Sequence, residues 1–334
     1  MNDSFFSIIM PVYNTYPPYL REAVESVFDL DYNGYEFIIV NDGTNRTETL
    51  DVLKEYEDRC TIIHQENSGI SASRLKALSI AKGEYIFFLD SDDHIDKDAL
   101  IVLNGIIREH HPDVIISEPP RYLENYRKIE FRNKFFEEGS VSKDTVIREL
   151  CRLHINGIGD KYVKRELYQN MSNSIDTSFI NGEDLQQSTY IILKANSFYY
   201  SEFPLQYYRY NLQQREYYDA TDLNDINFTV PAYRMLFEQH HEYDKFLPIF
   251  KQAAMNSVIY NAFKICKVSS THKEKADVLN QLNKLEIVKI LSGIKARVSP
   301  VSSFLYYILI HKHYRFLTLL ATIYHKIFGL SNLY

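Results

Sequence analysis

The chain contains no tryptophan, only three cysteines and no long uninterrupted apolar run. Cys60, Cys151 and Cys266 lie far apart without a Cys-x-x-Cys spacing, which indicates reduced thiols in a cytoplasmic protein rather than a disulfide scaffold. No window approaches the roughly 18 apolar residues that a bilayer-spanning helix needs. The N-terminus lacks a basic segment followed by a long apolar one, so we expect no signal peptide.

Basic residues are also scarce relative to acidic ones. The chain has 37 Lys and Arg against 44 Asp and Glu, which gives a net charge of 37 − 44 = −7. Non-specific nucleic-acid binding needs a basic surface, so we expect no nucleic-acid partner. With 334 residues, of which 45% are hydrophobic and 24% charged, the composition is typical of a globular protein with two domains.

Tyrosine and phenylalanine are abundant by contrast. The chain has 27 Tyr and 20 Phe, and a biased genome or a role in binding explains such a count equally well. Pairs such as Tyr199-Tyr200 and Tyr306-Tyr307 concentrate in the second half of the chain. Because tyrosine combines an apolar ring with a polar tip, this placement favours an acceptor groove or an interface.

The first 118 residues alternate short apolar runs with amphipathic segments. Five runs apolar on both faces, at 7–12, 36–42, 61–65, 85–90 and 113–118, predict buried and largely parallel strands. Apolar residues at helical spacing predict helices over 20–28, 49–56 and 71–81, the last ending at Gly83. This alternation predicts an α/β fold with a mostly parallel central sheet.

The remainder of the chain changes character. Residues 121–210 combine expected helices at 143–154 and 183–195 with extended segments at 197–202 and 204–210. From about residue 222 onward, four amphipathic stretches predict helices alone. We therefore expect a domain over 1–215, with halves 1–118 and 119–215, and a helical domain over 216–334.

Three carboxylates follow the expected strand that ends at residue 90. Asp90, Asp92 and Asp93 lie at the carboxyl end of that strand, where open α/β sheets bind their ligands. Clustered carboxylates repel one another unless a cation lies among them, and oxygen ligands suit Mg²⁺ or Mn²⁺. The alternative is an acidic turn that caps the next helix.

Polar residues also follow the first two expected strands. Asp42 and Gly43 end the second strand, where Asp42 could accept a hydrogen bond from a base and Gly43 would let a ligand approach. Tyr13 and Asn14 follow the first strand and could stack on a base and hydrogen-bond to it. Each segment alone is also explained by a turn or a helix cap.

Five segments together resemble the family 2 glycosyltransferases of the GT-A fold. They are PVYN at 11–14, VNDGT at 40–44, ENSGISASRLKAL at 66–78, GEYIFFLDSDD at 83–93 and GEDL at 182–185. Their order and spacing match that family, and the resemblance covers residues 5–210. It implies a GT-A nucleotide-sugar-binding domain over 1–215, with the nucleotide-sugar half first and the acceptor half second.

The resemblance also implies roles for individual residues. It implies a UDP-sugar donor, held with Mn²⁺ or Mg²⁺ by the metal ligands Asp92 and Asp90. The residues that it implies for donor binding are Pro11, Tyr13, Asn14, Asp42, Asn67, Arg74, Asp90, Ser91 and Lys161.

Inverting transfer also needs a base for the acceptor hydroxyl. Glu183 and Asp184 open an expected helix and resemble the Glu-Asp motif of the family, which implies that Asp184 is the base and that Glu183 orients either Asp184 or the acceptor. Acidic residues at a helix N-terminus also stabilise the helix dipole, so a purely structural role is the alternative.

A basic and aromatic stretch closes the chain. Residues 302–330 interleave apolar rings with histidine, lysine and arginine, which predicts a basic aromatic helix. Such a helix can lie in a membrane interface, or it can pack as core or as the contact of a homo-oligomer. The first alternative would place a cytoplasmic enzyme peripherally at the inner face of the membrane.

These observations lead to one hypothesis and two competitors. We expect an inverting, metal-dependent glycosyltransferase that moves a hexose or N-acetylhexosamine from a UDP-sugar to a hydroxyl of a glycan or glycoprotein, of the bacterial type that builds surface polysaccharides or glycosylates surface proteins. The alternative is a catalytically inactive GT-A subunit that binds or scaffolds a glycosylation complex. A dinucleotide-dependent oxidoreductase is disfavoured, because no Gly-x-Gly-x-x-Gly follows the first strand.

Overall fold

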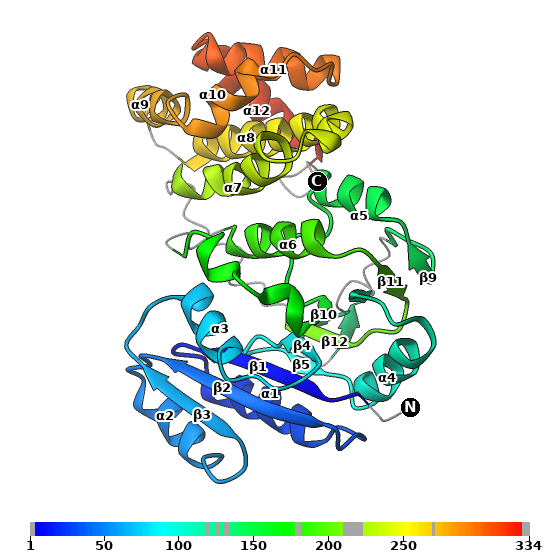
Figure 1. Cartoon of the computed structure of the whole chain (residues 1–334). Coiled ribbons are helices and arrows are strands. Elements are labelled where there is room, and N and C mark those ends of the chain that lie inside the picture. The colour runs from blue at the N-terminus through cyan, green and yellow to red at the C-terminus, as the bar shows by residue number, and fades with distance from the viewer. Residues whose placement is uncertain are drawn as a thin grey trace. The chain divides into compact units, whose positions relative to one another are not determined.

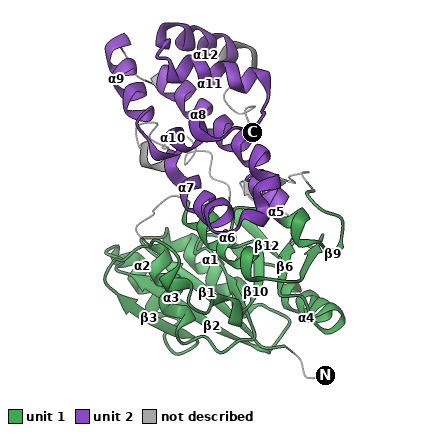
Figure 2. Cartoon of the chain, turned by 45° about the horizontal axis from the view of Figure 1, so that its top comes forward, with its two compact units in different colours: residues 1–146, 155–212 green, residues 147–154, 213–334 purple. Residues whose placement is uncertain are grey.

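The computed structural model describes residues 4–117, 121–124, 127–129, 134–177, 182–209, 223–268 and 271–328. The chain forms two compact units (Figure 2). Unit 1 comprises residues 1–146 and 155–212, and unit 2 comprises residues 147–154 and 213–334. The second unit therefore takes a short segment from the middle of the chain, which the linear division expected from the sequence did not include.

Unit 1 is built on an eight-stranded sheet with the order β3-β2-β1-β4-β10-β6-β11-β9. Its parallel strands are β1 (Phe6–Val12), β2 (Tyr35–Asp42), β3 (Thr61–Gln65), β4 (Tyr85–Phe88), β6 (Val114–Ser117) and β11 (Phe198–Ser201). The antiparallel strands are β9 (Gly139–Val141) and β10 (Lys161–Lys164). Figure 1 shows β1, β2 and β3 side by side in blue. The predicted α/β fold with a mostly parallel sheet is confirmed.

Helices pack against this sheet where the sequence alternates between strand and helix patterns. They are α1 (Pro17–Phe28), α2 (Thr47–Lys54), α3 (Ile70–Leu78), α4 (Ala99–His110) and α6 (Glu183–Lys194), and α5 (Lys143–Cys151) begins in unit 1 and ends in unit 2. Helix α1 starts with two prolines at positions that need no N–H donor, and it buries an apolar face that includes Leu20 and Val24.

One predicted helix end is wrong. Helix α3 ends at Leu78 rather than near Gly83. Gly83 instead lies against β1, where its N–H donates to Ser7 Oγ at 2.8 Å and an added Cβ would come 2.3 Å from the Ser7 nitrogen. This glycine therefore serves a close approach to a strand and not the end of a helix.

A second, smaller sheet completes unit 1. Its order is β5-β12-β7-β8, with β5 (His94–Ile95), β12 (Gln206–Arg209), β7 (Arg121–Glu124) and β8 (Arg127–Ile129). The pairing of β5 with β12 brings the segment that follows Asp90–Asp93 next to residues more than a hundred positions later in the chain.

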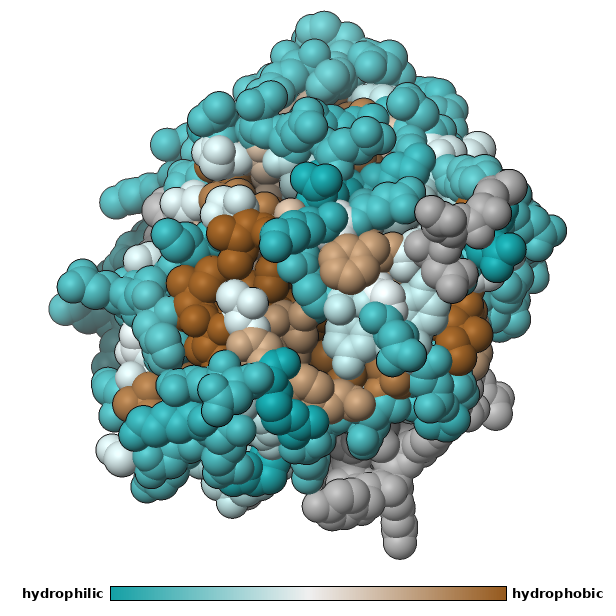
Figure 3. Space-filling model, turned by 60° about the horizontal axis from the view of Figure 1, so that its bottom comes forward, coloured by the Kyte–Doolittle hydropathy of each residue, from teal (hydrophilic) through white to brown (hydrophobic). Residues whose placement is uncertain are grey.

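Hydrophilic residues predominate on the face of the molecule in Figure 3, and the exposed hydrophobic residues lie mainly near its middle. Some exposed apolar surface is expected, because polar atoms alone cannot cover a protein.

Unit 2 is helical, as the sequence predicted. After α7 (Val230–Tyr233) and a π-helical turn at Arg234–Glu238 come α8 (Leu247–Val268), α9 (His272–Leu282), α10 (Glu286–Gly293), α11 (Pro300–Ile310) and α12 (Tyr314–Phe328). Among the residues described, no helix is both long and apolar enough to cross a membrane.

The single basic aromatic helix expected over 302–330 is divided in two. Lys312 adopts a left-handed conformation with φ 62°, and its N–H donates to the Leu309 carbonyl at 3.1 Å. The His313 N–H donates to the Ile308 carbonyl at 3.0 Å. These two bonds form a Schellman motif, which ends α11 and turns the chain into α12.

Candidate active site

The carboxyl ends of β1, β2 and β4 meet at one edge of the large sheet. These strands are parallel neighbours, so the residues that follow them lie close together. Thr15 Oγ1, after β1, lies 2.6 Å from Ser91 Oγ, after β4. The Asn14 N–H, also after β1, donates to Thr44 Oγ1 at 3.2 Å, after β2. The structure thus brings together three of the segments that the sequence singled out.

Asp42 organises the loop that leads into α3. Its carboxylate accepts hydrogen bonds from the Ser68 N–H at 2.8 Å, the Gly69 N–H at 2.9 Å and the Gln65 side chain at 2.8 Å. Gly43 has φ 70°, and an added Cβ would come 2.5 Å from the Asn67 nitrogen. Only glycine fits here, because the conformation and the close approach both exclude a side chain.

The residues at the end of β1 and just after it differ in how far their side chains are exposed to a ligand. Pro11 is buried within β1, whereas Tyr13 is 51% exposed and presents its ring to solvent. Asn14 Oδ1 accepts from the N–H groups of Asn45 and Arg46, both at 3.0 Å, so this side chain holds the turn before α2. Tyr13 is therefore the residue of this segment with a free face for a base.

Arg74 lies at the centre of the site. It sits on α3 with 2% of its side chain exposed, and its guanidinium lies 5.3 Å from the centre of the Phe88 ring. Arg74 Nη1 lies 2.5 Å from Asp184 Oδ1, and Nη2 lies 3.6 Å from Asp90 Oδ1. The Arg74 Nε–H has no hydrogen-bond partner among the described residues. One buried cation thus joins the acidic turn after β4 to the start of α6.

The acidic turn after β4 is held by Arg209, to which sequence reasoning assigned no role. The Arg209 N–H donates to Asp93 Oδ1 at 2.7 Å, and Arg209 Nε donates to the Asp92 carbonyl at 2.8 Å. Its guanidinium also pairs with Glu22 and lies 4.1 Å from the centre of the Tyr19 ring. Its place in the extended segment 204–210 gave a sequence signal, but the contacts depend on the pairing of strand β12 with β5, which follows the acidic turn.

Burial, and for three of them the nearness of other acids, raises the pKa of several carboxyls in the site. Burial, with Asp184 and Asp92 nearby, raises the pKa of Asp90 to about 6 despite Arg74. Burial raises the pKa of Asp92, and burial together with Asp90 and Asp92 raises that of Asp93 well above its ordinary value. Burial and the neighbouring Asp184 raise the pKa of Glu183 to about 7. Such a cluster favours a bound cation, because positive charge would offset the repulsion.

Glu183 and Asp184 form the first turn of α6, directly after Gly182 with φ 91°. Asp184 is 35% exposed while bound to Arg74, so its carboxylate reaches both the buried cation and solvent. A carboxylate in this position can accept a proton from a bound hydroxyl.

The side chain of Lys161, unlike that of Asp184, does not reach solvent. It is fully buried on β10, and its ammonium donates to the Ile155 carbonyl at 3.0 Å, to Asp160 Oδ1 at 2.6 Å and to the Gly157 carbonyl. Because an ammonium has three N–H donors, all of them are used within unit 1. This geometry favours a role in fixing the 155–160 loop.

Asp90 and Asp92 are the groups that could hold a divalent cation. Their hard carboxylate oxygens suit Mg²⁺ or Mn²⁺, which commonly complete their octahedron with water and phosphate oxygens. No group of three or more His, Cys, Asp or Glu side chains within the described residues is arranged to hold a metal ion. The donor set fits a metal that shares its coordination with a substrate phosphate.

Comparison with known proteins identifies the family. Residues 7–181, just over half of the chain, match the sequence pattern of glycosyl transferase family 2. The chain belongs to glycosyl transferase family 2. The matched range includes every implied donor-binding residue, and it ends just before Glu183 and Asp184.

Relatives of this glycosyltransferase family include the glycosyltransferase GlyG of Streptococcus pneumoniae, 36% identical over 122 residues, which are 36% of this chain and 40% of GlyG. The poly(ribitol-phosphate) β-N-acetylglucosaminyltransferase TarS of Staphylococcus aureus is 33% identical over 116 residues, 33% of this chain and 20% of TarS. The matched segments therefore span less than half the length of these relatives.

Solved structures share the GT-A fold over nearly the whole chain. S. aureus TarS 1–349 in complex with UDP superposes with a TM-score of 0.71 at 19% identity, covering 96% of this chain and 91% of that one. The mannosyltransferase PcManGT of Pyrobaculum calidifontis, in complex with GDP-Man and Mn²⁺, gives a TM-score of 0.53 at 12% identity, covering 98% and 89%.

Proposed function

We propose that this chain is an inverting, metal-dependent glycosyltransferase that moves a hexose or N-acetylhexosamine from a UDP-sugar to a hydroxyl of a glycan or glycoprotein. One observation carries the proposal. Arg74 joins Asp90, on the proposed donor side, to Asp184, on the proposed acceptor side. Inverting glycosyl transfer needs a base on the acceptor side and a cation near the leaving diphosphate, and this pairing supports an arrangement in which Asp184 is the base and Asp90 helps to hold the cation.

The nucleoside would bind at the edge formed by β1 and β2. The exposed Tyr13 ring offers a stacking face for uracil, and Asp42 offers a carboxylate already oriented by three donors. Asn14, Asn67 and Ser91 lie on the turns that shape this edge. Pro11 would act through the backbone of β1, and Lys161 would act by holding the 155–160 loop.

Asp184 would accept the proton of the acceptor hydroxyl as that oxygen attacks the anomeric carbon. Its ion pair with Arg74 orients the carboxylate, and Glu183 would orient the acceptor beside it. Attack on the side opposite the leaving UDP inverts the anomeric centre. Arg74 also contacts Asp90, so its guanidinium would lie near the diphosphate of a bound donor.

Asp92 and Asp90 would hold Mn²⁺ or Mg²⁺. When bound, such a cation stabilises the negative charge that develops on the departing diphosphate. The raised pKa values of both carboxyls support this assignment, because burial disfavours their ionised forms and a bound cation would offset that cost.

The relatives support the proposed UDP-sugar donor and the proposed class of acceptor. Solved TarS structures contain UDP and UDP-GlcNAc, and the PcManGT structure contains Mn²⁺. TarS acts on poly(ribitol phosphate) by its name, and GlyG is named a glycosyltransferase. We infer that this chain works in the cytoplasm on an acceptor destined for a bacterial surface.

The proposal is tested by screening UDP-sugars for stabilisation of the purified chain and for release of UDP, with and without Mn²⁺. A true donor raises the unfolding temperature by mass action and releases UDP only when the metal is present. Binding of a UDP-sugar without any turnover on candidate acceptors would favour the scaffold alternative. Absence of both binding and release for every UDP-sugar would overturn the proposal.

A further inference from the structure

Charge is distributed unevenly along this acidic chain. No Asp or Glu occurs after Glu286, although the chain as a whole carries a net charge of −7. The basic residues of that final segment are Lys289, Lys295, Arg297, Lys312, Arg315 and Lys326. The C-terminal segment is therefore a cationic region of an otherwise anionic protein.

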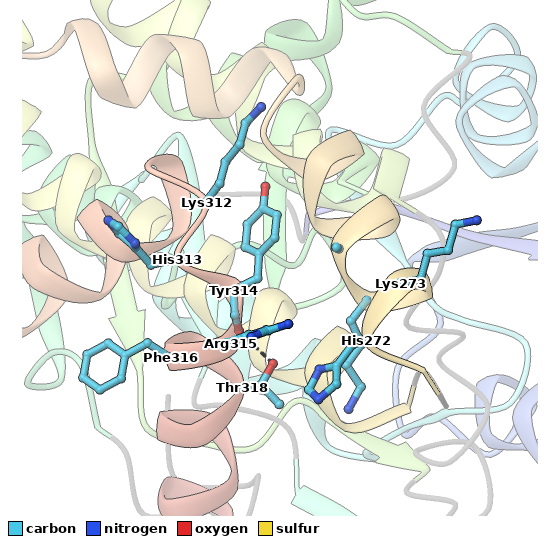
Figure 4. A pocket seen from close by; sticks show the side chains of 10 residues that line it. His272, Lys273, Lys312, His313, Tyr314, Arg315, Phe316 and Thr318 are labelled. Atoms are coloured by element: carbon cyan, nitrogen blue, oxygen red, sulfur yellow. Dashed lines mark hydrogen bonds between the residues drawn. The ribbon is translucent and has the colours of Figure 1, made fainter.

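Part of this positive charge lines a pocket within unit 2. The pocket has a volume of about 600 Å³ and lies between the start of α9 and the turn from α11 to α12. Its cationic side chains are Lys273, Lys275, Lys312 and Arg315. In Figure 4, Arg315 and His272 extend toward each other between α9 and α12, while Lys273 and Lys312 lie farther out on opposite sides.

None of these four cations forms an ion pair with a residue in the described part of the chain. The nearby acid Glu274 accepts from the Thr271 N–H at 3.1 Å in the cap of α9. Asp277 lies on the same helix and is exposed. Four cations around one hollow repel one another, which favours an anionic ligand with several oxygen atoms.

An exposed apolar face lies beside the pocket. Large apolar side chains that are 45–67% exposed follow helical spacing on α11 and α12. They are Val301, Phe304, Tyr307, Phe316, Leu319 and Ile323. The rings of Phe304 and Phe316 lie 6.3 Å apart and join the two helices, and Phe316 also lines the pocket.

We propose that α11, α12 and the start of α9 form a docking surface for a bilayer that contains anionic phospholipids. The cations would bind headgroup phosphates, and the apolar side chains would enter the boundary between headgroups and acyl chains. Cations and exposed apolar side chains on one surface favour a membrane over a soluble ligand. A soluble polyanion would use the cations but not the exposed apolar side chains.

A second copy of the chain fits less well. The common symmetric dimer places the same surface on both partners, so this surface would bring like cations together without any acid of the final segment to pair with them. An anionic membrane satisfies the cations and the apolar side chains at once. This inference does not depend on the proposed glycosyl transfer.

The test is co-sedimentation of the full chain with phosphatidylcholine vesicles that contain or lack phosphatidylglycerol. We expect binding only to the anionic vesicles, weakened by salt. The double variant Lys312→Gln/Arg315→Gln should bind about 25-fold more weakly, since each surface cation contributes about a fivefold change. The variant Phe304→Ser/Leu319→Ser should also lose binding. The matched control Lys76→Gln/Lys82→Gln removes the same charge from unit 1 and should bind normally.

Other results would overturn the proposal. Binding that survives Phe304→Ser/Leu319→Ser, together with equal binding to soluble polyphosphate, would assign the pocket to a soluble polyanion. A dimer in solution that this apolar double variant converts to monomers would assign the face to a second copy. Equal loss of binding in the control variant would show only a general charge effect. UDP release measured without vesicles reports separately on the proposed transfer.

Discussion

The two units use their charged side chains in opposite ways. In unit 1, the buried guanidinium of Arg74 is enclosed by Asp90 and Asp184, and the ammonium of Lys161 is fully bonded within its own loop. In unit 2, the cations around the pocket between α9 and α12 are exposed or half-buried and form no ion pair with an acid in the described part of the chain.

This difference separates two physical roles of charge. A buried charge must be paired because desolvation is costly, so it fixes the positions of its partners. An exposed charge contributes little to folding but remains available to attract a ligand of opposite sign. Unit 1 therefore uses charge to fix the residues of the candidate site, and unit 2 leaves charge available for the proposed anionic membrane.

The largest expected effect follows from removing the proposed base. Asp184→Asn should lower the rate of sugar transfer by about 10²- to 10⁴-fold, the usual contribution of a general base, and leave UDP affinity nearly unchanged. Steady-state kinetics and UDP titration measure the two quantities. The control Asp51→Asn makes the same chemical change on the surface of α2 and should have no effect. Retention of most turnover by Asp184→Asn would show that another group is the base.

Breaking the buried pair should cost more stability than breaking an exposed one. Arg74→Met leaves Asp90 and Asp184 without their shared cation and should lower the free energy of unfolding by about 2 kcal/mol, a value reduced because both acids are partly exposed. Arg21→Met breaks the exposed pair with Glu55 and should cost about 0.5 kcal/mol or less. Urea unfolding measures both. Equal losses would contradict the contrast between buried and exposed charges.

Asp113 offers a test of paired charge by pH. Burial opposes its ionisation, but the N–H groups of Asn196 and Ser197 and the ammonium of Lys164 lower its pKa below the ordinary 3.8. Its stabilisation is therefore complete above pH 4 and is lost as the pH falls through the lowered value. Asp113→Asn should be less stable than the parent by about 1.5 kcal/mol at neutral pH.

The stability gap between Asp113→Asn and the parent should close as the pH falls below 4. Chemical denaturation at a series of pH values measures this gap. A gap that stays constant into acid would mean that the charge of Asp113 contributes nothing.

The smallest expected effect concerns the turn between α11 and α12. Lys312 is left-handed with φ 62°, a conformation that costs a non-glycine residue about 1 kcal/mol. Lys312→Gly should therefore stabilise the fold by about that amount and still weaken binding to anionic vesicles. Lys312→Ala removes the same charge without relieving the backbone, so it should weaken binding without stabilising. A gain in stability from both variants would point to charge repulsion in the pocket instead.

Patterns of neighbouring residues predicted much of the fold. The apolar runs at 36–42 and 85–90 appear as β2 and β4, and the helical region after residue 222 is helical in the described residues. Local patterns predicted two helix boundaries wrongly. Gly83 ends no helix because β1 lies against it, and the expected C-terminal helix breaks at Lys312 through a Schellman turn.

The sequence by itself determined the α/β class and which strand ends carry polar side chains, because alternation and apolar runs depend only on near neighbours. Only the tertiary structure decided that Arg74 binds Asp184, 110 residues away, and that Arg209 holds the turn at Asp92 and Asp93. The same holds for the cationic pocket, whose residues come from two helices separated in the chain. Such pairings depend on how the helices and strands pack, so the residues near a buried charge in the sequence do not predict which distant side chain will neutralise it.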